Sequence, residues 1–405
     1  MNILLAPNVY HPMATGVPVF TRRLASGLVR EGHRVVIVTR KLTQDQAPFE
    51  VIDGVEVHRM AFIFPWSLLW QGSREGVLRF CRQCPSDIRR LVRLVAENEI
   101  ELINIHSLSG SVFPYVLFAG LFADRQLVAT LHGNEFFRLD TSHNGMRRLL
   151  LRYGLRRANR IVVLSSRHAG EVRRFCPEAA AKVVTITNGV AVDEFGDSAR
   201  FPFPSPYVLS ISRLNPLKGH DVLLAAFRSV ADREENTHLI IVGDGPERIR
   251  LHAVCLALGL QDRVTFLGEV GRERVRELLA GCEFLAISSW SEGVPTVALE
   301  AMASGRAVVG TRVGGLPELV SDAETGLLVP PGEPEPLAEA MLLLLRDRDR
   351  GIAMGERARA FVKDHHDFTR TVDRYLEVYR QALRDANAGR ERKKQSDPGS
   401  KLEVE

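Results

Sequence analysis

The stretch Ser288-Ser-Trp-Ser-Glu-Gly-Val-Pro-Thr-Val-Ala-Leu-Glu-Ala-Met-Ala-Ser-Gly305 passes from a strand end, through a polar loop, into a helix. Pro295 is predicted in the first helical turn, where its missing N–H would have no intrahelical partner. The free backbone N–H groups around Thr296 would then form an anion site at the helix N-terminus. Glu292 lies in the loop and Glu300 lies one to two turns into the helix, so the two carboxylates can flank one bound molecule.

Two further stretches are also predicted to form turns that could contact a bound ligand. Val309-Gly-Thr-Arg-Val-Gly-Gly-Leu-Pro-Glu318 contains the turn Gly314-Gly315, where a backbone can approach a ligand closely. Upstream, the turn that ends in Asn-Pro-Leu-Lys-Gly219 follows a predicted strand, and Arg213 and Lys218 lie on either side of its proline. An arginine fork and a lysine ammonium in these positions could bind a diphosphate from one side.

The whole chain has the alternation that is typical of parallel α/β proteins. Short Val/Ile/Leu runs, which suit strands buried on both faces of a sheet, alternate with amphipathic stretches. In the second half, strands are predicted at Tyr207–Ser212, Leu239–Val242, Val264–Leu267, Phe284–Ile287, Ala307–Thr311 and Leu327–Val329. In the first half, strands are predicted at Asn2–Pro7, Arg34–Thr39, Val55–Arg59, Leu102–His106, Leu127–His132, Ile161–Ser165 and Val183–Thr187.

A proline-rich break separates the two halves. Residues 196–206 include three prolines in five residues and show no periodicity, so they are predicted to form a linker. We therefore expect two Rossmann-like, doubly wound parallel-sheet domains, 1–195 and 207–365, facing each other across a cleft, with ligands at the carboxyl ends of the strands. A terminal helix over 366–383 is predicted to return to the first domain, and the charged tail 384–405 is predicted to be disordered.

Together these motifs resemble the family 4 glycosyltransferases of the GT-B fold. The resemblance rests on the spacing Glu292-x7-Glu300, on the Gly-Gly-Leu-Pro-Glu stretch and on the Arg-x4-Lys-Gly turn. It extends from Met1 to about Arg380, because Asn188-Gly-Val with Asp193, Val242-Gly-Asp-Gly-Pro246 and Val264-Thr-Phe-Leu-Gly268 follow in the order that the family shows. It implies an enzyme that transfers a hexosyl or N-acetylhexosaminyl unit, with retention of configuration, from a UDP- or GDP-sugar to a glycan or lipid-linked acceptor.

The resemblance also implies roles for individual residues. The donor site would contain Gly16, Arg213, Lys218, Val270, Glu292, Gly293, Val294, Thr296, Val297 and Glu300. The catalytic set would be His132, Glu292, Arg213 and Lys218, and the acceptor-side residues would be His106, Asn134 and Glu135. The leaving diphosphate would itself take the proton of the acceptor hydroxyl, so Glu292 is expected to act by charge and position rather than as a covalent nucleophile. Thr15 departs from the family pattern, because many relatives have a second glycine before Gly16.

Charge is unevenly distributed along the 405 residues. Residues 1–190 contain 25 Lys and Arg against 15 Asp and Glu, and the remaining residues contain 28 against 34, within a net charge of +4. This basic first half suggests an anionic partner, and the aromatic run Phe62–Trp70 suits a bilayer interface, so docking on an anionic membrane surface is one hypothesis. The alternatives are a loop packed over the acceptor cleft and a surface on which arginine is simply frequent.

The sequence indicates neither export nor a bound cofactor. No signal-peptide pattern begins the chain, and the longest apolar stretch, Val112 to Ala123, is about half of the ~20 residues that cross a bilayer. Five cysteines do not suggest a disulfide framework. We therefore expect a cytoplasmic protein that needs no cofactor, metal or nucleic-acid partner. If the docking hypothesis holds, it would be peripheral on the inner face of the cell membrane. Asp347-Arg-Asp349 has the spelling of a metal site but falls near a predicted helix end.

Other functions on the same architecture remain open. A nucleotide-sugar epimerase would act on a UDP-sugar without an acceptor. A non-enzymatic sugar-binding protein would bind free saccharide, although such proteins are usually exported and the basic pair Arg213 and Lys218 favours a phosphate ligand. A phosphorylase is disfavoured, because no lysine is placed for pyridoxal phosphate.

Overall fold

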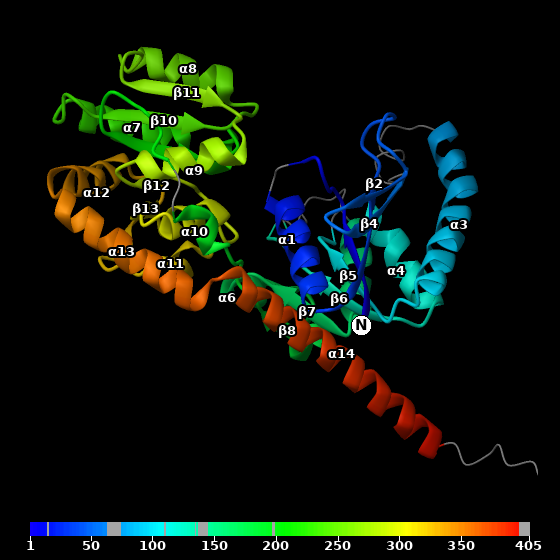
Figure 1. The fold of residues 1–405 in the computed structure, drawn as a ribbon. Coiled ribbons are helices and arrows are strands. Elements are labelled where there is room, and N and C mark those ends of the chain that lie inside the picture. Colours follow the sequence, from blue (N-terminus) through cyan, green and yellow to red (C-terminus); the bar gives the residue numbers. More distant parts are fainter. Residues whose placement is uncertain are drawn as a thin grey trace, which may run out of the picture. The chain divides into compact units, whose positions relative to one another are not determined.

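The structure, a computed structural model, consists of two α/β units (Figure 1). It describes residues 1–13, 16–62, 74–108, 111–133, 135–136, 145–196 and 199–396. Unit 1 comprises Met1–Ile186 and Val372–Glu405, and unit 2 comprises Thr187–Thr371. Each unit is built on its own sheet, so the prediction of two parallel-sheet α/β domains is confirmed.

Unit 1 contains an eight-stranded sheet with the strand order β3-β4-β2-β1-β5-β6-β7-β8. Neighbouring strands are parallel except for the antiparallel pair β3 and β4. The strands are β1 (Asn2–Pro7), β2 (Arg34–Arg40), β3 (Phe49–Ile52), β4 (Val55–Met60), β5 (Leu102–His106), β6 (Gln126–Thr130), β7 (Arg160–Val163) and β8 (Val183–Thr185). The helices are α1 (Gly16–Arg30), α3 (Arg74–Glu97), α4 (Val112–Phe122), α5 (Gly145–Arg157), α6 (Ser166–Phe175), the 3-10 helix η2 (Pro177–Lys182) and most of α14 (Phe368–Ser396).

The long helix α14 joins the end of the chain to unit 1. Its residues Tyr375 and Tyr379 are fully buried there, and the Tyr379 hydroxyl accepts a hydrogen bond from Asn104 Nδ2 at 2.6 Å. The helix continues to Ser396, well past residue 384, where disorder was expected. One contact lies at the start of this extension, since Asp385 forms an ion pair with Arg160. Residues 397–405 lie outside the described part of the chain.

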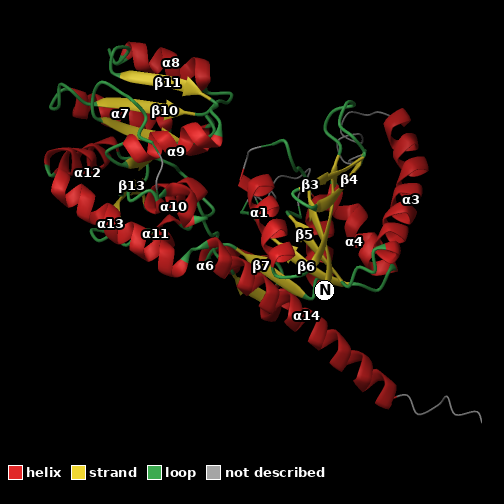
Figure 2. Cartoon of the chain, viewed as in Figure 1, coloured by secondary structure: helices red, strands yellow, loops and turns green. Residues whose placement is uncertain are grey.

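Unit 2 contains a six-stranded parallel sheet with the order β11-β10-β9-β12-β13-β14. Figure 2 distinguishes its strands from the helices around them. The strands are β9 (Tyr207–Ile211), β10 (His238–Val242), β11 (Val264–Gly268), β12 (Leu285–Ile287), β13 (Val308–Thr311) and β14 (Gly326–Val329). The helices are α7 (His220–Ala231), α8 (Arg248–Ala257), α9 (Arg272–Gly281), α10 (Thr296–Ala303), α11 (Leu316–Leu319), α12 (Pro334–Arg346) and α13 (Arg348–His365), with short 3-10 helices η3 (Val192–Phe195) and η4 (Pro216–Lys218).

The strand order of unit 2 fixes where a ligand can bind. The chain moves outward from β9 through β10 to β11, then returns to place β12 on the other side of β9 and moves outward again. The loops that leave β9 and β12 therefore diverge at a topological switch point. Open sheets of this kind bind ligands outside the carboxyl ends of their strands at that point.

The proline-rich segment 196–206 belongs to unit 2 and is not the division between the units. The two units divide at Ile186 and Thr187, nine residues before the predicted linker begins. Phe201 and Phe203 pack around the ring of Tyr207, and the Phe201 N–H donates to Glu277 O at 2.9 Å. Three prolines do prevent regular structure in this segment, but its two phenylalanines attach it to the surface of unit 2.

Candidate functional site

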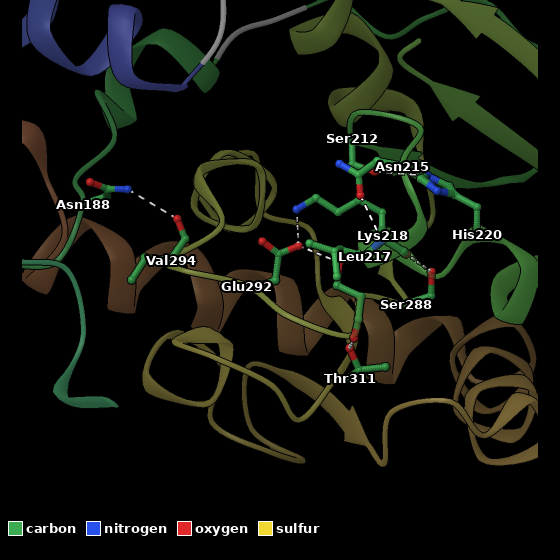
Figure 3. Close-up of polar contacts among 11 residues, drawn as sticks. Asn188, Ser212, Asn215, Leu217, Lys218, His220, Ser288, Glu292, Val294 and Thr311 are labelled. Atoms are coloured by element: carbon green, nitrogen blue, oxygen red, sulfur yellow. Dashed lines mark hydrogen bonds and ion pairs between the residues drawn. The ribbon is translucent and has the colours of Figure 1, made fainter. Parts of the chain in front are cut away.

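Two turns meet at the switch point of the unit 2 sheet (Figure 3). One follows β9 and ends at Gly219, and the other follows β12 from Ser288 to Pro295. The Trp290 N–H donates to Leu217 O at 2.8 Å, and Ser288 Oγ donates to Lys218 O at 2.9 Å. The two predicted donor-binding turns, which lie about seventy residues apart in the sequence, are thus hydrogen-bonded to each other.

Lys218 and Glu292 form an ion pair at this junction. Lys218 Nζ lies 2.6 Å from Glu292 Oε1, and Ser289 Oγ donates to the same oxygen at 2.6 Å. The Glu292 side chain is 8% exposed and that of Lys218 is 23% exposed. An ion pair with so little solvent contact is screened less than a surface pair. The sequence predicted both residues at the donor, and the structure adds that they contact each other directly.

Glycines allow the close approach of these backbones. Gly219 has a φ of +59°, and a Cβ there would lie 2.2 Å from Ser288 O. Gly314 has a φ of +58°, and a Cβ there would lie 1.8 Å from Glu292 O. The Gly315 N–H donates to Gly293 O at 2.7 Å. The Gly314-Gly315 turn was predicted to let the backbone approach a ligand, and here it approaches the loop that carries Glu292.

Helix α10 begins directly after this loop. Pro295 is its N-cap residue, with an extended backbone and no side-chain hydrogen bond to the helix, and Thr296 is the first helical residue. The prediction that Pro295 lies within the first turn was therefore wrong by one residue. Val294 is buried, whereas Thr296, Val297 and Glu300 are partly exposed. The first turn of α10 thus has the uncapped start that the predicted anion site requires.

The remaining predicted donor residues of unit 2 lie near the same end of the sheet. Arg213 is exposed in the turn after β9, and Val270 is partly exposed just after β11. The turn after β10 packs against the start of the Arg213 turn, because a Cβ at Gly243 would lie 2.0 Å from Ser212 O.

Several residues that support this site were missed as site residues. Asn188, 5% exposed, donates from Nδ2 to Val294 O at 3.3 Å and so holds the loop before α10. Thr311 Oγ1 donates to Ser289 O at 2.6 Å. The Asn-Gly-Val stretch was the available signal for Asn188, whereas nothing in the sequence identifies Thr311.

His220 is the first residue of α7 and directly follows the turn that contains Lys218. Its Nε2 lies 3.1 Å from Ser212 Oγ. Burial, and secondarily the charge of Lys218, lowers the pKa of His220 to about 4, so this ring is neutral near pH 7.

In unit 1, His106 and His132 lie at the carboxyl ends of β5 and β6. His106 Nδ1 lies 3.2 Å from His132 Nε2, the two rings are stacked, and Phe20 meets the His132 ring edge-on with ring centroids 5.5 Å apart. Burial lowers the pKa of His132 to about 4 and that of His106 well below its usual value. Both rings are therefore neutral near pH 7 and can exchange one hydrogen bond.

Glu135 has a different surrounding from the one its predicted acceptor-side role implies. Its side chain is buried, and its two carboxylate oxygens accept from the backbone N–H groups of His132 at 3.0 Å and Gly133 at 2.9 Å. Its second oxygen also lies 3.9 Å from His168 Nε2. Glu135 thus holds the loop that carries His132. Asn134 lies outside the described residues, and Gly16 is exposed at the first residue of α1.

The Asp347-Arg-Asp349 pattern has a structural explanation. Asp347 is the N-cap of α13 and accepts from the Arg350 N–H at 3.0 Å. Across the described ranges, no group of three His, Cys, Asp or Glu residues is arranged to hold a metal ion. None of the helices in those ranges is both long enough and apolar enough to span a membrane.

Comparison with known proteins gives matches over both units. Residues 193–361 match the family model described as glycosyl transferases group 1, and residues 15–189 match that of the glycosyl transferase 4-like domain. A D-inositol 3-phosphate glycosyltransferase from Mycobacteroides abscessus is 30% identical over 93% of this chain and 86% of its own length. A GDP-mannose-dependent alpha-(1-6)-phosphatidylinositol monomannoside mannosyltransferase from Mycobacterium tuberculosis is 30% identical over 67% of this chain and 74% of its own length.

Among solved structures, Anabaena HepE in complex with UDP-glucose has the same fold, with a TM-score of 0.71 and 22% identity over 94% of this chain and 99% of that one. The matches cover nearly the whole sequence and agree with the two doubly wound sheets. The chain belongs to the family 4 glycosyltransferases of the GT-B fold and is an enzyme that transfers a sugar from a nucleotide-sugar.

Proposed function

We propose that this enzyme transfers a hexosyl or N-acetylhexosaminyl unit from a UDP- or GDP-sugar to a glycan or lipid-linked acceptor, with retention of the anomeric configuration. The observation that carries the proposal is the ion pair between Lys218 and Glu292 at the unit 2 switch point. It supplies a fixed cation and a fixed carboxylate at the place where a doubly wound sheet binds its ligand.

The geometry of Lys218 suits a diphosphate. Its ammonium group has three N–H donors, and Glu292 Oε1 accepts one of them, so two remain for phosphate oxygens. Breaking the bond between sugar and phosphate leaves negative charge on the departing nucleotide. Lys218, Arg213 and the uncapped start of α10 would stabilise that charge without reorganising. Glu292 would hold Lys218 in place before the donor arrives and would approach the sugar with its other carboxylate oxygen.

Retention requires the new bond to form on the face from which the diphosphate leaves. In the proposed step, the bond between the anomeric carbon and the phosphate oxygen breaks, and the acceptor hydroxyl attacks the same face. Its proton passes to the departing diphosphate. The neutral rings of His132 and His106 would take part as hydrogen-bonding groups rather than as cations, because burial depresses their pKa values.

The names of similar proteins support the proposed choice of donor and acceptor. The M. tuberculosis relative is named for GDP-mannose and for a phosphatidylinositol mannoside, and HepE binds UDP-glucose in its crystal structure. These names favour a UDP- or GDP-sugar as donor and make a lipid-linked acceptor reasonable. The predicted docking segment Phe62–Trp70 cannot add to this, because all of it except Phe62 lies outside the described residues.

A thermal-shift panel of UDP, GDP and ADP with their sugars tests the donor. A ligand at 100 times its dissociation constant stabilises the folded protein by ~2.7 kcal/mol, so the correct nucleotide should stand out by its shift in Tm. The best donor is then incubated with candidate acceptors, and the anomeric configuration of the first-formed product is read by NMR. Inversion would contradict the retaining step. Isomerisation of the donor without any acceptor would favour the epimerase instead.

A further inference from the structure

Most of the positive charge of the first half lies in one short segment. Residues 145–182 contain ten Arg and Lys against two Glu, a balance of +8, whereas the whole chain has a net charge of +4. Residues 1–144 contain 15 Arg and Lys against 13 Asp and Glu, so they are nearly neutral. The basic character of the first half is therefore concentrated in α5, α6 and η2, with Arg160 on β7 between them.

These three elements pack into one surface, which we call the α5–α6 surface. The Arg148 guanidinium lies 5.6 Å from the centre of the Phe175 ring at the end of α6. Lys182, at the end of η2, donates from Nζ to Arg156 O at 2.7 Å. Leu151 and Leu155 of α5 are buried, so this face of the helix packs on unit 1 and the opposite face is exposed to solvent.

The two glutamates do not neutralise this surface. Glu171 pairs with Arg167 and Glu178 pairs with Arg152. Arg156, Arg157, Arg173 and Arg174 are all exposed, and none of them forms an ion pair within the described ranges. Burial, followed by the charges of Arg157, Arg160 and Arg156, lowers the pKa of Lys182, which agrees with crowding of like charges here.

Two apolar side chains are exposed among the arginines. Leu149 is 63% exposed and Tyr153 is 41% exposed, one helical turn further along α5. They lie beside the row formed by Arg148, Arg152 and Arg156, since residues four apart share a helix face. A helix with arginines next to an exposed leucine and tyrosine has the composition of one that lies in the plane of a membrane interface.

We propose that the α5–α6 surface docks on a bilayer that contains anionic phospholipids. The unpaired arginines would contact lipid phosphates, and Leu149 and Tyr153 would enter the boundary between headgroups and acyl chains. A nucleic acid would satisfy the arginines but would leave the exposed Leu149 without a role. Arg147, at the start of α5, donates from Nη2 to the backbone oxygen of Glu135 at 3.3 Å. The carboxylate of Glu135 holds the His132 loop, so α5 is linked to that loop through Glu135. This proposal is independent of the segment Phe62–Trp70 and of the identity of the donor.

Flotation of the full chain with vesicles tests the proposal. We expect binding to vesicles of phosphatidylcholine mixed with phosphatidylglycerol and little binding to phosphatidylcholine alone. Each basic residue near an anionic surface is worth about 1 kcal/mol, roughly fivefold, so Arg156→Glu/Arg157→Glu should reduce the partition coefficient at least about tenfold. Leu149→Ser/Tyr153→Ser should weaken binding without changing the net charge, which a purely electrostatic contact with phosphate would not show.

The matched control is Arg350→Glu/Arg370→Glu. Both residues are exposed in unit 2, have no ion pair within the described ranges and give the same change in net charge. We expect this variant to bind vesicles like the parent, and circular dichroism confirms folding of each variant. Equal loss in the control and in Arg156→Glu/Arg157→Glu would overturn the proposal, and so would no binding by the parent. Tight binding of single-stranded RNA, lost in Arg156→Glu/Arg157→Glu while vesicle binding is unchanged, would also overturn it.

Discussion

The side chains at the carboxyl ends of the strands are charged in unit 2 and neutral in unit 1, although the two sheets are similar. In unit 2 the switch point contains an ion pair, and Ser289 and the backbone of a polar loop support its charges. In unit 1 the corresponding end contains His106 and His132, packed against Phe20 and held neutral by burial. The difference lies in the loops. Polar loops can keep charges solvated by protein groups, whereas aromatic packing removes water and favours the neutral form.

This contrast fits the proposal that unit 2 binds the donor diphosphate and that unit 1 supplies the acceptor-side residues. In the proposed reaction a nucleotide diphosphate would bring its charge to unit 2, where fixed cations would be needed before and during the reaction. The acceptor hydroxyl and the reacting face of the sugar are neutral, so polar but uncharged groups such as His132 would suffice there. The predictions below test whether charge in unit 2 and neutrality in unit 1 are what the enzyme uses.

The largest expected effect comes from removing the cation of unit 2. Lys218→Ala should lower kcat by roughly 10²–10³-fold, the scale of losing one oxyanion-type donor, because the charge on the diphosphate grows as the bond breaks. Steady-state kinetics with the donor identified above measures the loss. Lys363→Ala, at an exposed position of α13, is the matched control and should behave like the parent. A kcat near the parent value would show that this turn does not contact the phosphates.

Acid should destabilise unit 1 before unit 2. The pKa of His132 is lowered from 6.5 to about 4 in the folded protein, so the unfolded chain binds more protons between these values. The stability it contributes is complete above pH 6.5 and falls as the pH is lowered, by about 2 kcal/mol at pH 5. In unit 1 burial lowers the pKa values of His106 and His168 as well, and in unit 2 it lowers that of His220.

Hydrogen exchange followed by mass spectrometry at pH 7.5 and pH 5, corrected for intrinsic rates, resolves the two units. We expect the strands of unit 1 to lose more protection than those of unit 2. His132→Asn should reduce the difference, because it removes one titrating ring. Equal loss in both units, or earlier loss in unit 2, would contradict this account of the buried histidines.

A smaller effect is expected from changing Glu300, the second glutamate of the predicted donor site. Glu300 lies on α10, and the family resemblance implies that it holds the ribose hydroxyls of the donor, which it would contact equally before and during the reaction. Glu300→Gln should therefore mainly raise the donor KM, by about 1.5 kcal/mol, with little change in kcat. The split between KM and kcat is the measurement. If kcat falls as far as in Lys218→Ala, Glu300 acts on the transition state and its proposed role is wrong.

No effect is expected from chelation. If Arg213, Lys218 and the start of α10 balance the diphosphate, excess EDTA should leave the rate unchanged. The control adds Mg²⁺ or Mn²⁺ back after dialysis. Loss of activity that either ion restores would mean that a metal supplies part of the positive charge assigned here to unit 2.

Strand prediction succeeded where a strand is buried on both faces. Continuous runs such as Ile3–Ala6 and Leu239–Val242 leave few alternatives in a parallel sheet. The edge strand β3 was missed because Phe49 and Val51 are exposed and its apolar pattern is weak. Its signal was the turn Asp53-Gly54, where both residues have positive φ, which is typical of a tight hairpin.

The sequence by itself determined the alternation of strands and helices, the positions of the two turns that are predicted to bind the donor, and the family. These properties follow from local periodicity and from residue types at fixed spacing. Only the tertiary structure decided that Lys218 pairs with Glu292, that Glu135 turns inward to hold the His132 loop, and that the excess charge of residues 145–182 gathers on one surface. Such contacts depend on strand order and packing, which join residues distant in the chain and leave no pattern within either segment.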